Sequence, residues 1–318
     1  MPKINYLDDN LNIEGKRILL RVDFNVPTNN GSITETSRIE KVLPTIKFLI
    51  KKKAKIIIIS HIGRPKGKNV PSLSLEPIAK KLKDLLNKNV FFLDKTVGIE
   101  VVEKSKKISN GDILVLENLR FHKEEELNSE NFAKELSKNG DIFVNEAFSC
   151  SHRAHASVSE ITKHIKSFAG KQLTEEVNSI KMITDDAKKP VSCIIGGSKI
   201  STKIGVLSNL IKKMENIVIV GAMANNFIKH KKYNIGKSLF EKNAENLIEN
   251  IIKQSEIHNC KLIIPNDVMV SKDLNSEGAL KNLNEINDSD IILDIGSKTV
   301  EIIFKIIDNS KTVLWNGP

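Results

Sequence analysis

The stretch RILLRVDFNVP, residues 17–27, shows the pattern on which the fold of this chain rests. Its apolar, β-rich part predicts a buried strand over residues 17–26, with polar side chains toward the end. Similar β-rich runs recur at 55–62, 90–94, 113–119, 142–148, 191–196, 217–221, 261–270, 291–296 and 312–315. Segments with helical spacing lie between them, at 38–53, 75–87, 131–138, 173–186, 203–214, 244–258 and 298–308.

Several of these strands are apolar without alternating polar positions, which is typical of parallel strands that helices cover on both faces. The sequence therefore predicts an α/β fold in which both halves are doubly wound, Rossmann-like parallel sheets. A length of 318 residues favours two domains. Residues 170–189 lack strand character and end at Pro190, directly before a strand, so they predict a joining helix. We expect domains at 1–170 and 190–318, with a linker helix and hinge at 171–189.

The composition excludes several classes of protein. Hydrophobic residues make up 40% and charged residues 28%, as in globular proteins. The aliphatic runs are far shorter than the ~18 apolar residues of a membrane span, and the first ten residues are polar, so we expect neither a spanning helix nor a secretory signal. The three cysteines, Cys150, Cys193 and Cys260, are widely spaced, which argues against a disulfide framework or a zinc site and favours a reducing cytoplasm.

The charge balance is basic, with 49 Lys and Arg against 39 Asp and Glu and a pI near 9.3, as a nucleic-acid-binding protein would also show. However, 43 of the basic residues are Lys, and all six Arg lie within the first 153 residues. Arginine binds phosphate and carboxylate groups in a bidentate way that lysine cannot match. The first 170 residues carry 29 basic and 21 acidic groups, against 20 and 18 in the rest, so we expect the anion-binding surface in the first half.

Polar residues follow four strands of the first half, at the carboxyl ends where ligands collect in open α/β sheets. These residues are Asp23 and Asn25, His61 and Arg64, Arg120, and Arg153. Any single Arg could equally cap a helix or form a surface ion pair. The convergence of all four strand ends favours an anion site.

The second half contains IGGSK at 195–199, where a strand ends and a helix is expected to begin. Two glycines allow close approach of an anion, and Lys199 and Lys203, spaced i and i+4, would share one helical face, which predicts a phosphate cradle. The motif is neither a Walker A loop nor a G-x-G-x-x-G fingerprint, and a plain turn before a solvated helix face is an alternative. Small residues at 221–224, 265–268, 294–297 and 315–318 would leave a slot for an adenine ring. For Met223 and Trp315, core packing is equally compatible with the sequence.

The sequence resembles the phosphoglycerate kinase family through a series of motifs that follow the family's order from residue 21 to the end. These motifs are RVDFNVP, SHIGRPKG, ENLRF, VNEAF, HRAHAS, GGSKIS, GAMAN, DIGSKT and WNGP. The resemblance implies a glycolytic transferase that moves a phosphoryl group between 1,3-bisphosphoglycerate and ADP to give 3-phosphoglycerate and ATP. The first domain would bind 3-phosphoglycerate, through Asp23, Asn25, Arg38, His61, Ile62, Gly63, Arg64, Arg120 and Arg153. Arg38 and Lys199 would act on the transferring phosphoryl group. Gly196, Gly197, Lys203, Gly221, Gly296 and Asn316 would bind the nucleotide in the second domain.

The sequence departs from the family pattern at Glu146, Val220 and Ser297, where the family usually has Asp, Gly and Pro. It also stops at Pro318, inside WNGP, before the family's metal-binding aspartate. We therefore expect the second domain to be incomplete, the Mg²⁺ ligand to lie in the missing segment, and this chain to have little activity by itself. A non-catalytic truncated product and a basic nucleic-acid-binding protein remain alternatives. We expect a cytoplasmic monomer that closes about its hinge and binds neither nucleic acid nor a membrane.

Overall fold

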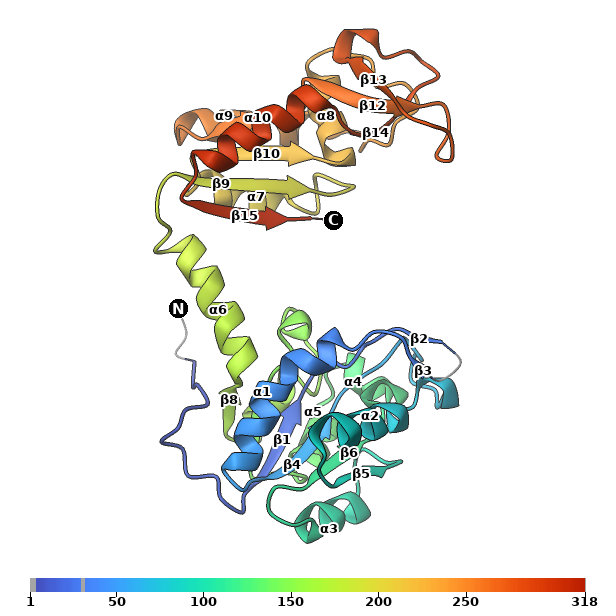
Figure 1. Cartoon of the computed structure of the whole chain (residues 1–318), viewed down its shortest axis with the longest axis vertical. Helices are drawn as coiled ribbons and strands as arrows, with labels where there is room; N and C mark the ends of the chain where they lie inside the picture. Colours follow the sequence, from blue (N-terminus) through green and yellow to red (C-terminus); the bar gives the residue numbers. More distant parts are fainter. Residues whose placement is uncertain (1–3, 30–31, 318) are drawn as a thin grey trace. The chain divides into compact units, whose positions relative to one another are not determined.

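The computed structural model describes residues 4–29 and 32–317. The chain divides into two compact units, Met1–Ser179 and Ile180–Pro318. The division falls inside helix α6 (Lys171–Thr184), which corresponds to the predicted joining helix. In Figure 1 the first unit runs from blue to yellow-green and the second from yellow to red.

The first unit is built on a parallel sheet of order β5-β6-β4-β1-β7-β8. Its strands are β1 (Arg17–Arg21), β4 (Lys55–Ile59), β5 (Val90–Leu93), β6 (Ile113–Leu116), β7 (Ile142–Asn145) and β8 (Ser167–Ala169). The helices between them are α1 (Ser37–Lys51), α2 (Glu76–Leu86), α3 (Ile99–Lys107), α4 (Lys123–Glu126) and α5 (Glu130–Ser137). Two short strands, β2 (Thr28–Asn29) and β3 (Ser32–Ile33), form a separate antiparallel pair.

Helices cover both faces of this sheet because successive strand residues point to opposite sides. In β1, Ile18 and Leu20 belong to one apolar cluster, which includes residues of α1 and α2. Leu19 points the other way, into a second cluster with Val101 of α3 and Phe132 of α5. Burial on both faces explains why these strands are apolar throughout.

The second unit contains a parallel sheet of order β11-β10-β9-β15. Its strands are β9 (Val191–Gly196), β10 (Asn216–Val220), β11 (Lys261–Ile263) and β15 (Thr312–Asn316). Helices α7 (Ile204–Ile211), α8 (Ala222–His230) and α9 (Glu245–Ile257) contribute to the apolar cluster on one face, and α10 (Ser297–Asp308) contributes to the cluster on the other. A three-stranded antiparallel sheet of β12 (Asp267–Ser271), β13 (Ala279–Asn282) and β14 (Ile291–Ile295) packs against α8 through Ile228.

The α/β class and the parallel sheets were predicted correctly, but several details were not. The single strand predicted at 261–270 is two strands in different sheets, because the chain breaks around Pro265, which has no backbone N–H to donate to a sheet. As a result, the antiparallel sheet was not expected. Helices α3 and α8 were also missed. Among the described residues, no helix combines the length and the apolar character needed to cross a bilayer.

Candidate active site

Polar residues of the first unit converge where the strand order reverses. From β1, the chain adds β4 on one side and β7 on the other, so the carboxyl ends of neighbouring strands open a crevice there. The segments that follow β1, β4, β6 and β7 carry the predicted residues Asp23, His61, Arg120 and Arg153. We call these four segments, residues 22–25, 60–64, 117–121 and 146–153, together with Arg38 of α1, the rim.

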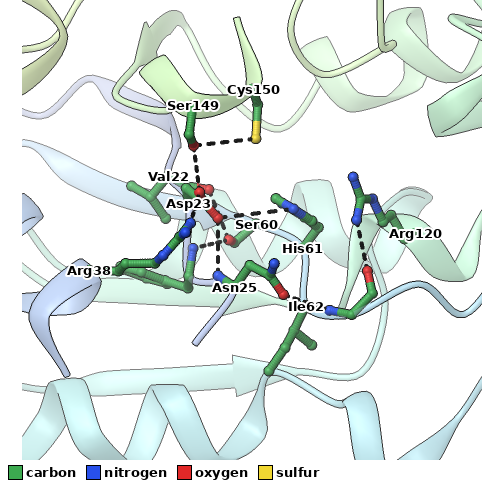
Figure 2. A network of polar contacts seen from close by, with 12 residues as sticks. Val22, Asp23, Asn25, Arg38, Ser60, His61, Ile62, Arg120, Ser149 and Cys150 are labelled. Carbon is green, nitrogen blue, oxygen red and sulfur yellow. Dashed lines mark hydrogen bonds and ion pairs between the residues drawn. The ribbon is translucent and has the colours of Figure 1, made fainter. Parts of the chain in front are cut away.

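The carboxylate of Asp23 lies at the centre of the rim (Figure 2). It forms an ion pair with Arg38 and accepts hydrogen bonds from the Ser149 hydroxyl and from the backbone N–H of Asn25, the last at 3.1 Å. The strand-end loop is held further by Ser60, whose hydroxyl accepts from Phe24 N–H at 2.9 Å. Asp23 therefore joins the segment after β1 to the segment after β7 and orients the Arg38 guanidinium.

His61 is buried beside this carboxylate. Its Nε2 atom lies 4.0 Å from Asp23 Oδ1, and its Nδ1 atom lies 3.2 Å from Nη2 of Arg21. Burial, followed by the positive charges of Arg21 and Arg120, lowers the pKa of His61 well below its usual range. The imidazole is therefore neutral at physiological pH.

The loop at 62–64 is fixed by amide and guanidinium contacts. Asn25 Oδ1 accepts from Gly63 N–H at 2.8 Å, and Arg120 Nη1 donates to Gly63 C=O at 2.7 Å. Asn118 engages the backbone N–H and C=O of Ile62, whose side chain packs in the core. Gly63 has φ +64°, and a Cβ there would lie 2.8 Å from Leu73, so this turn requires glycine.

The arginines of the rim differ in exposure. Arg120 is 5% exposed, and burial lowers the pKa of its guanidinium, although Glu126 lies 3.3 Å from its Nε atom. Arg38 is 46% exposed in its side chain, Arg153 is half-buried with its Nε donating to His152 at 3.2 Å, and Arg64 is exposed. Within residues 4–29 and 32–317, no hydrogen bond or ion pair of Arg64 is found. These guanidinium groups can bind an incoming anion.

A cavity of about 260 Å³ adjoins Asp23, Arg38 and Ser149. Lys41 also lines it, although no motif in the sequence predicted a role for this lysine. Ser149 was missed as well, although it follows the predicted strand 142–148 directly, which is where a ligand-facing residue is expected. Arg21 was quoted in the motif but given no role.

Glu146, one of the departures from the family pattern, joins the rim to α6. It is 2% exposed and accepts hydrogen bonds from the Thr45 hydroxyl and from the backbone N–H groups of Gln172 (3.2 Å) and Leu173 (2.9 Å). Burial raises the pKa of Glu146. A Cβ at Gly170 would lie 2.2 Å from this carboxylate, so the glycine makes room for it.

In the second unit, the strand order reverses between β9 and β15, and predicted nucleotide-binding residues meet there. The Lys203 ammonium donates to Asn316 Oδ1 at 2.5 Å. Gly221, with φ +68°, packs so closely on Gly197 that a Cβ would lie 3.4 Å from its backbone. The Val220 side chain lies against Gly196, where a Cβ would come within 3.2 Å of it. This departure from the family pattern is thus accommodated beside a glycine.

The expectation that Lys199 and Lys203 lie on one helical face is wrong. Helix α7 begins at Ile204, with Lys203 as its N-cap, so Lys199 lies in the preceding loop. In this loop, the N–H and hydroxyl of Ser201 donate to the carboxylate of Glu241. Lys199 is exposed, and residues 197–202 form a loop that leads to the N-cap of α7.

A second cavity of about 200 Å³ lies beside Gly221, Ala224, Pro265 and Ile295. Its lining is mostly apolar and includes residues from three of the four runs at which the sequence predicted an adenine slot, but no described residue of 315–318. Met223 is fully buried in the core, whereas Trp315 is 73% exposed. Gly296 faces Asp267, where a Cβ would lie 2.3 Å from the carboxyl carbon, so its glycine character has a packing cause as well.

Comparison with known proteins identifies one family. A family model described as phosphoglycerate kinase matches residues 8–318. Phosphoglycerate kinase of Wolbachia pipientis subsp. Culex pipiens is 46% identical over 319 residues, which cover 100% of this chain and 79% of that protein. The enzyme of Finegoldia magna is 43% identical, over 97% of this chain and 79% of its own length.

Two solved structures are similar over nearly the whole chain. Phosphoglycerate kinase from Coxiella burnetii superimposes with a TM-score of 0.86 at 36% identity, covering 97% of this chain and 79% of that one. The enzyme from Pyrococcus horikoshii gives a TM-score of 0.82 at 27% identity, covering 99% and 81%. With its strand-end motifs, its two parallel sheets and this similarity in sequence and structure, the chain belongs to the phosphoglycerate kinase family.

Proposed function

We propose that the rim of the first unit binds 3-phosphoglycerate. The observation that carries this proposal is the ion pair of Asp23 with Arg38 beside His61, at a switch point of the sheet. Arg120 and Arg153 lie close enough to His61 to lower its pKa, and Arg64 is exposed in the loop that follows β4. Bidentate guanidinium groups suit a tetrahedral phosphate dianion, and Asp23 and Asn25 offer acceptors for a substrate hydroxyl. Arg64, Arg120 and Arg153 would hold the phosphate that is not transferred.

We propose that Arg38 and Lys199 act on the phosphoryl group in flight. Phosphoryl transfer asks for in-line positioning and neutralisation of charge rather than covalent chemistry from the protein. Both side chains are at least partly exposed, so they are free to contact a substrate. Transfer also requires the two bound substrates to meet, so residues 171–189 are proposed to act as the hinge.

We propose that the second unit binds ADP or ATP. Lys203, held by Asn316, would contact nucleotide phosphates above the glycine loops at Gly196, Gly197 and Gly221, and the cavity beside Gly221 would take the adenine. Gly296 would border the same pocket, since Ile295 lines it.

Mg²⁺ would neutralise nucleotide phosphate charge in this reaction. The described residues at the loop do not fit a magnesium site: Lys199 and Lys203 are cations, the Asn316 oxygen accepts from Lys203, and Glu241 is bound to Ser201. Magnesium prefers several oxygen ligands, usually including a carboxylate. We therefore assign no residue among them to the metal.

We further propose that the protein acts as a cytoplasmic monomer on small molecules alone. The three cysteines are free thiols and buried, which suits a reducing compartment. The rival function, nucleic-acid binding, rests only on the basic charge. A salt titration of RNA binding separates the two: we expect no specific binding at physiological salt, and tight RNA binding with a steep salt slope would favour the rival.

The proposed function is tested by isothermal titration of 3-phosphoglycerate into the chain, with the Arg120→Lys variant alongside. We expect saturable binding at one site, weakened in the variant. Absence of binding to a folded chain would contradict the proposal.

A further inference from the structure

Arg21 is a buried arginine at the end of the central strand β1 and is 1% exposed. All three of its guanidinium nitrogens have defined partners. Nε donates to Ser157 Oγ at 2.9 Å, Nη1 donates to the Val22 carbonyl, and Nη2 lies 3.2 Å from His61 Nδ1. The side chain therefore reaches from the sheet to the ring of His61, and each of its three nitrogens already has a partner within the protein.

The direction of the hydrogen bonds at Ser157 is fixed by Glu125. This carboxylate is fully buried and accepts from the Ser157 hydroxyl at 2.6 Å and from the Ser157 N–H at 2.9 Å. The single hydroxyl proton is used there, so the oxygen of Ser157 accepts from Arg21. Through Ser157, the negative charge of Glu125 balances the positive charge of Arg21 in the interior, which holds the guanidinium in place.

The chemistry of the guanidinium determines the state of the histidine. Arginine carries five N–H donors and no acceptor, so a ring nitrogen that faces it must offer a lone pair. His61 Nδ1 is that nitrogen, and the ring proton must then lie on Nε2, the atom 4.0 Å from Asp23 Oδ1. Figure 2 shows the ring of His61 beside Asp23, within the network that also contains Ser149 and Cys150.

We propose that Arg21 is a positioning residue that holds His61 as the neutral Nε2–H tautomer, so that His61 donates a hydrogen bond to an anionic oxygen of the bound substrate. The substrate part of this inference rests on the proposed function, whereas the tautomer does not. His61 would then contribute a donor to the rim without acting as a base or a cation.

The surrounding charges agree with this assignment. Arg21 faces His61 from β1, Asp23 from the segment after β1, Arg120 from the 3-10 turn Leu119–Phe121, and Arg153 and His155 from the loop after β7. Four of these five groups disfavour a positive ring, and the carboxylate of Asp23 is already engaged by Arg38 and Ser149. The Nε2–H group therefore remains available for a ligand.

Metal binding by Asp23, His61 and Cys150 would require the opposite tautomer of His61. One ligand atom each from Asp23, His61 and Cys150 lies within 4.8 Å of the others, and this donor set is of a kind that binds Zn²⁺. A metal on Nε2 would need the lone pair there, which moves the proton to Nδ1, against the Arg21 donor. Metal binding by this cluster is thus excluded by the proposal and can be tested with it.

The tautomer is measured by NMR on the ¹⁵N-histidine-labelled chain without substrate, with the His61 signals assigned from a His61→Gln variant. Two-bond couplings and ¹⁵N shifts distinguish the two tautomers and the imidazolium. We expect His61 to remain the Nε2–H tautomer from about pH 5 to 8, on both sides of the usual histidine pKa. The Nδ1–H tautomer, an imidazolium at pH 7, or a shift of the His61 signals on addition of Zn²⁺ would overturn the proposal.

Variants of Arg21 test whether this residue keeps His61 neutral. Arg21→Met should bring the His61 titration up toward its usual range, whereas Arg21→Lys, which retains a cationic donor, should keep the ring neutral. The matched control is Arg17→Met on the same strand, which removes an ion pair to Asp141 at 2.6 Å and should leave the His61 signals unchanged. An unchanged His61 titration in folded Arg21→Met would overturn the assignment, and if that variant fails to fold the wild-type spectrum still decides.

Addition of 3-phosphoglycerate tests the donor role. We expect the Nε2 signal of His61 to shift on binding, and His61→Ala to weaken binding about tenfold more than His61→Gln, which retains an N–H donor. Binding without a shift of this signal would overturn the donor role alone. Absence of binding would contradict the proposed function and the donor role, while leaving the tautomer assignment intact.

Discussion

At the scale of single residues, the arginines of the rim differ in their surroundings. Arg120 is buried and its guanidinium already donates to Gly63 C=O, whereas Arg38 and Arg64 face solvent. A buried cation acts on an anion through a lower effective dielectric than an exposed one. We therefore expect Arg120 to contribute more to substrate affinity than Arg64.

Replacement of Arg120 by lysine should weaken 3-phosphoglycerate binding by roughly 1.5–3 kcal/mol, about ten- to hundredfold, because the bidentate contact is lost. Arg64→Lys and Arg153→Lys should have smaller effects of the same sign. Calorimetric affinities for 3-phosphoglycerate and for ADP provide the measurement, with Arg17→Lys as the control. Equal losses of both affinities would argue against a substrate role for these arginines.

Replacement of Lys199 and of Lys203 should change different kinetic parameters. Lys199, exposed in the loop, should act mainly in the transition state, so Lys199→Ala should lower kcat by roughly a hundredfold or more with little change in KM. Lys203→Ala should instead raise KM for the nucleotide, since Lys203 is held at the predicted phosphate position by Asn316. A coupled assay for ATP formation measures kcat and KM for both variants, and a normal kcat for Lys199→Ala would exclude its catalytic role.

At the scale of elements, the buried carboxylate of Asp267 holds the start of helix α10. Asp267, at the start of β12, accepts from Lys298 N–H at 2.9 Å, Thr299 N–H at 2.8 Å and the Thr299 hydroxyl at 2.6 Å, in the first turn of α10. Burial acts to raise the pKa of Asp267, but these hydrogen bonds lower it overall. The ionised carboxylate therefore stabilises the connection between the antiparallel sheet and α10.

Asp267→Asn should lower the free energy of unfolding by about 1–3 kcal/mol at pH 7, because amide donors at a helix start lose a charged acceptor. The pKa is lower in the folded state, so this stabilisation is complete above the unfolded pKa and is lost as the pH falls through the folded value. The difference between wild type and variant should shrink below about pH 4. Urea unfolding at several pH values measures it, with the exposed Asp308→Asn on the same helix as control; a difference independent of pH would refute this linkage.

The sequence predicted elements better than their exact ends. Continuous apolar runs such as 191–196 coincide with strands because burial on both faces leaves a local signal. No local signal distinguished the strands of the antiparallel sheet from those of the parallel sheet, since β11 and β12 form one β-rich run on either side of Pro265. Likewise, Ser201 before α7 is bound by Glu241, forty residues away in sequence, and no local pattern reveals such a partner.

The residues of the candidate site were likewise predictable only where the signal is local in sequence. Asp23, Asn25, His61, Gly63 and Arg120 could be placed together because each comes just after a strand, and parallel sheets align such ends. The roles of Arg21, Ser149 and Glu146 could not be predicted in this way. Their contacts to His61, Asp23 and the amides of α6 depend on side-chain directions and buried distances that only the folded structure specifies.

At the scale of the whole molecule, the binding site that we propose in each unit lies at the point where the strand order of that unit reverses. The arginines gather in the first unit, whereas the second uses lysines and glycine loops. We expect this division to serve a small anionic substrate bound by arginines in the first unit and nucleotide phosphates bound by lysines and glycine loops in the second. It also explains why the excess of positive charge lies in the first half of the chain.

The central claim, that the rim binds 3-phosphoglycerate, is tested most directly by a crystal structure of the chain with this ligand. We predict that the phosphate lies against Arg64, Arg120 and Arg153, that the carboxylate end points toward Arg38, and that a hydroxyl contacts Asp23 or Asn25. A ligand bound instead at the 196–203 loop, or a ligand in the rim whose phosphate touches none of the three arginines, would contradict the account.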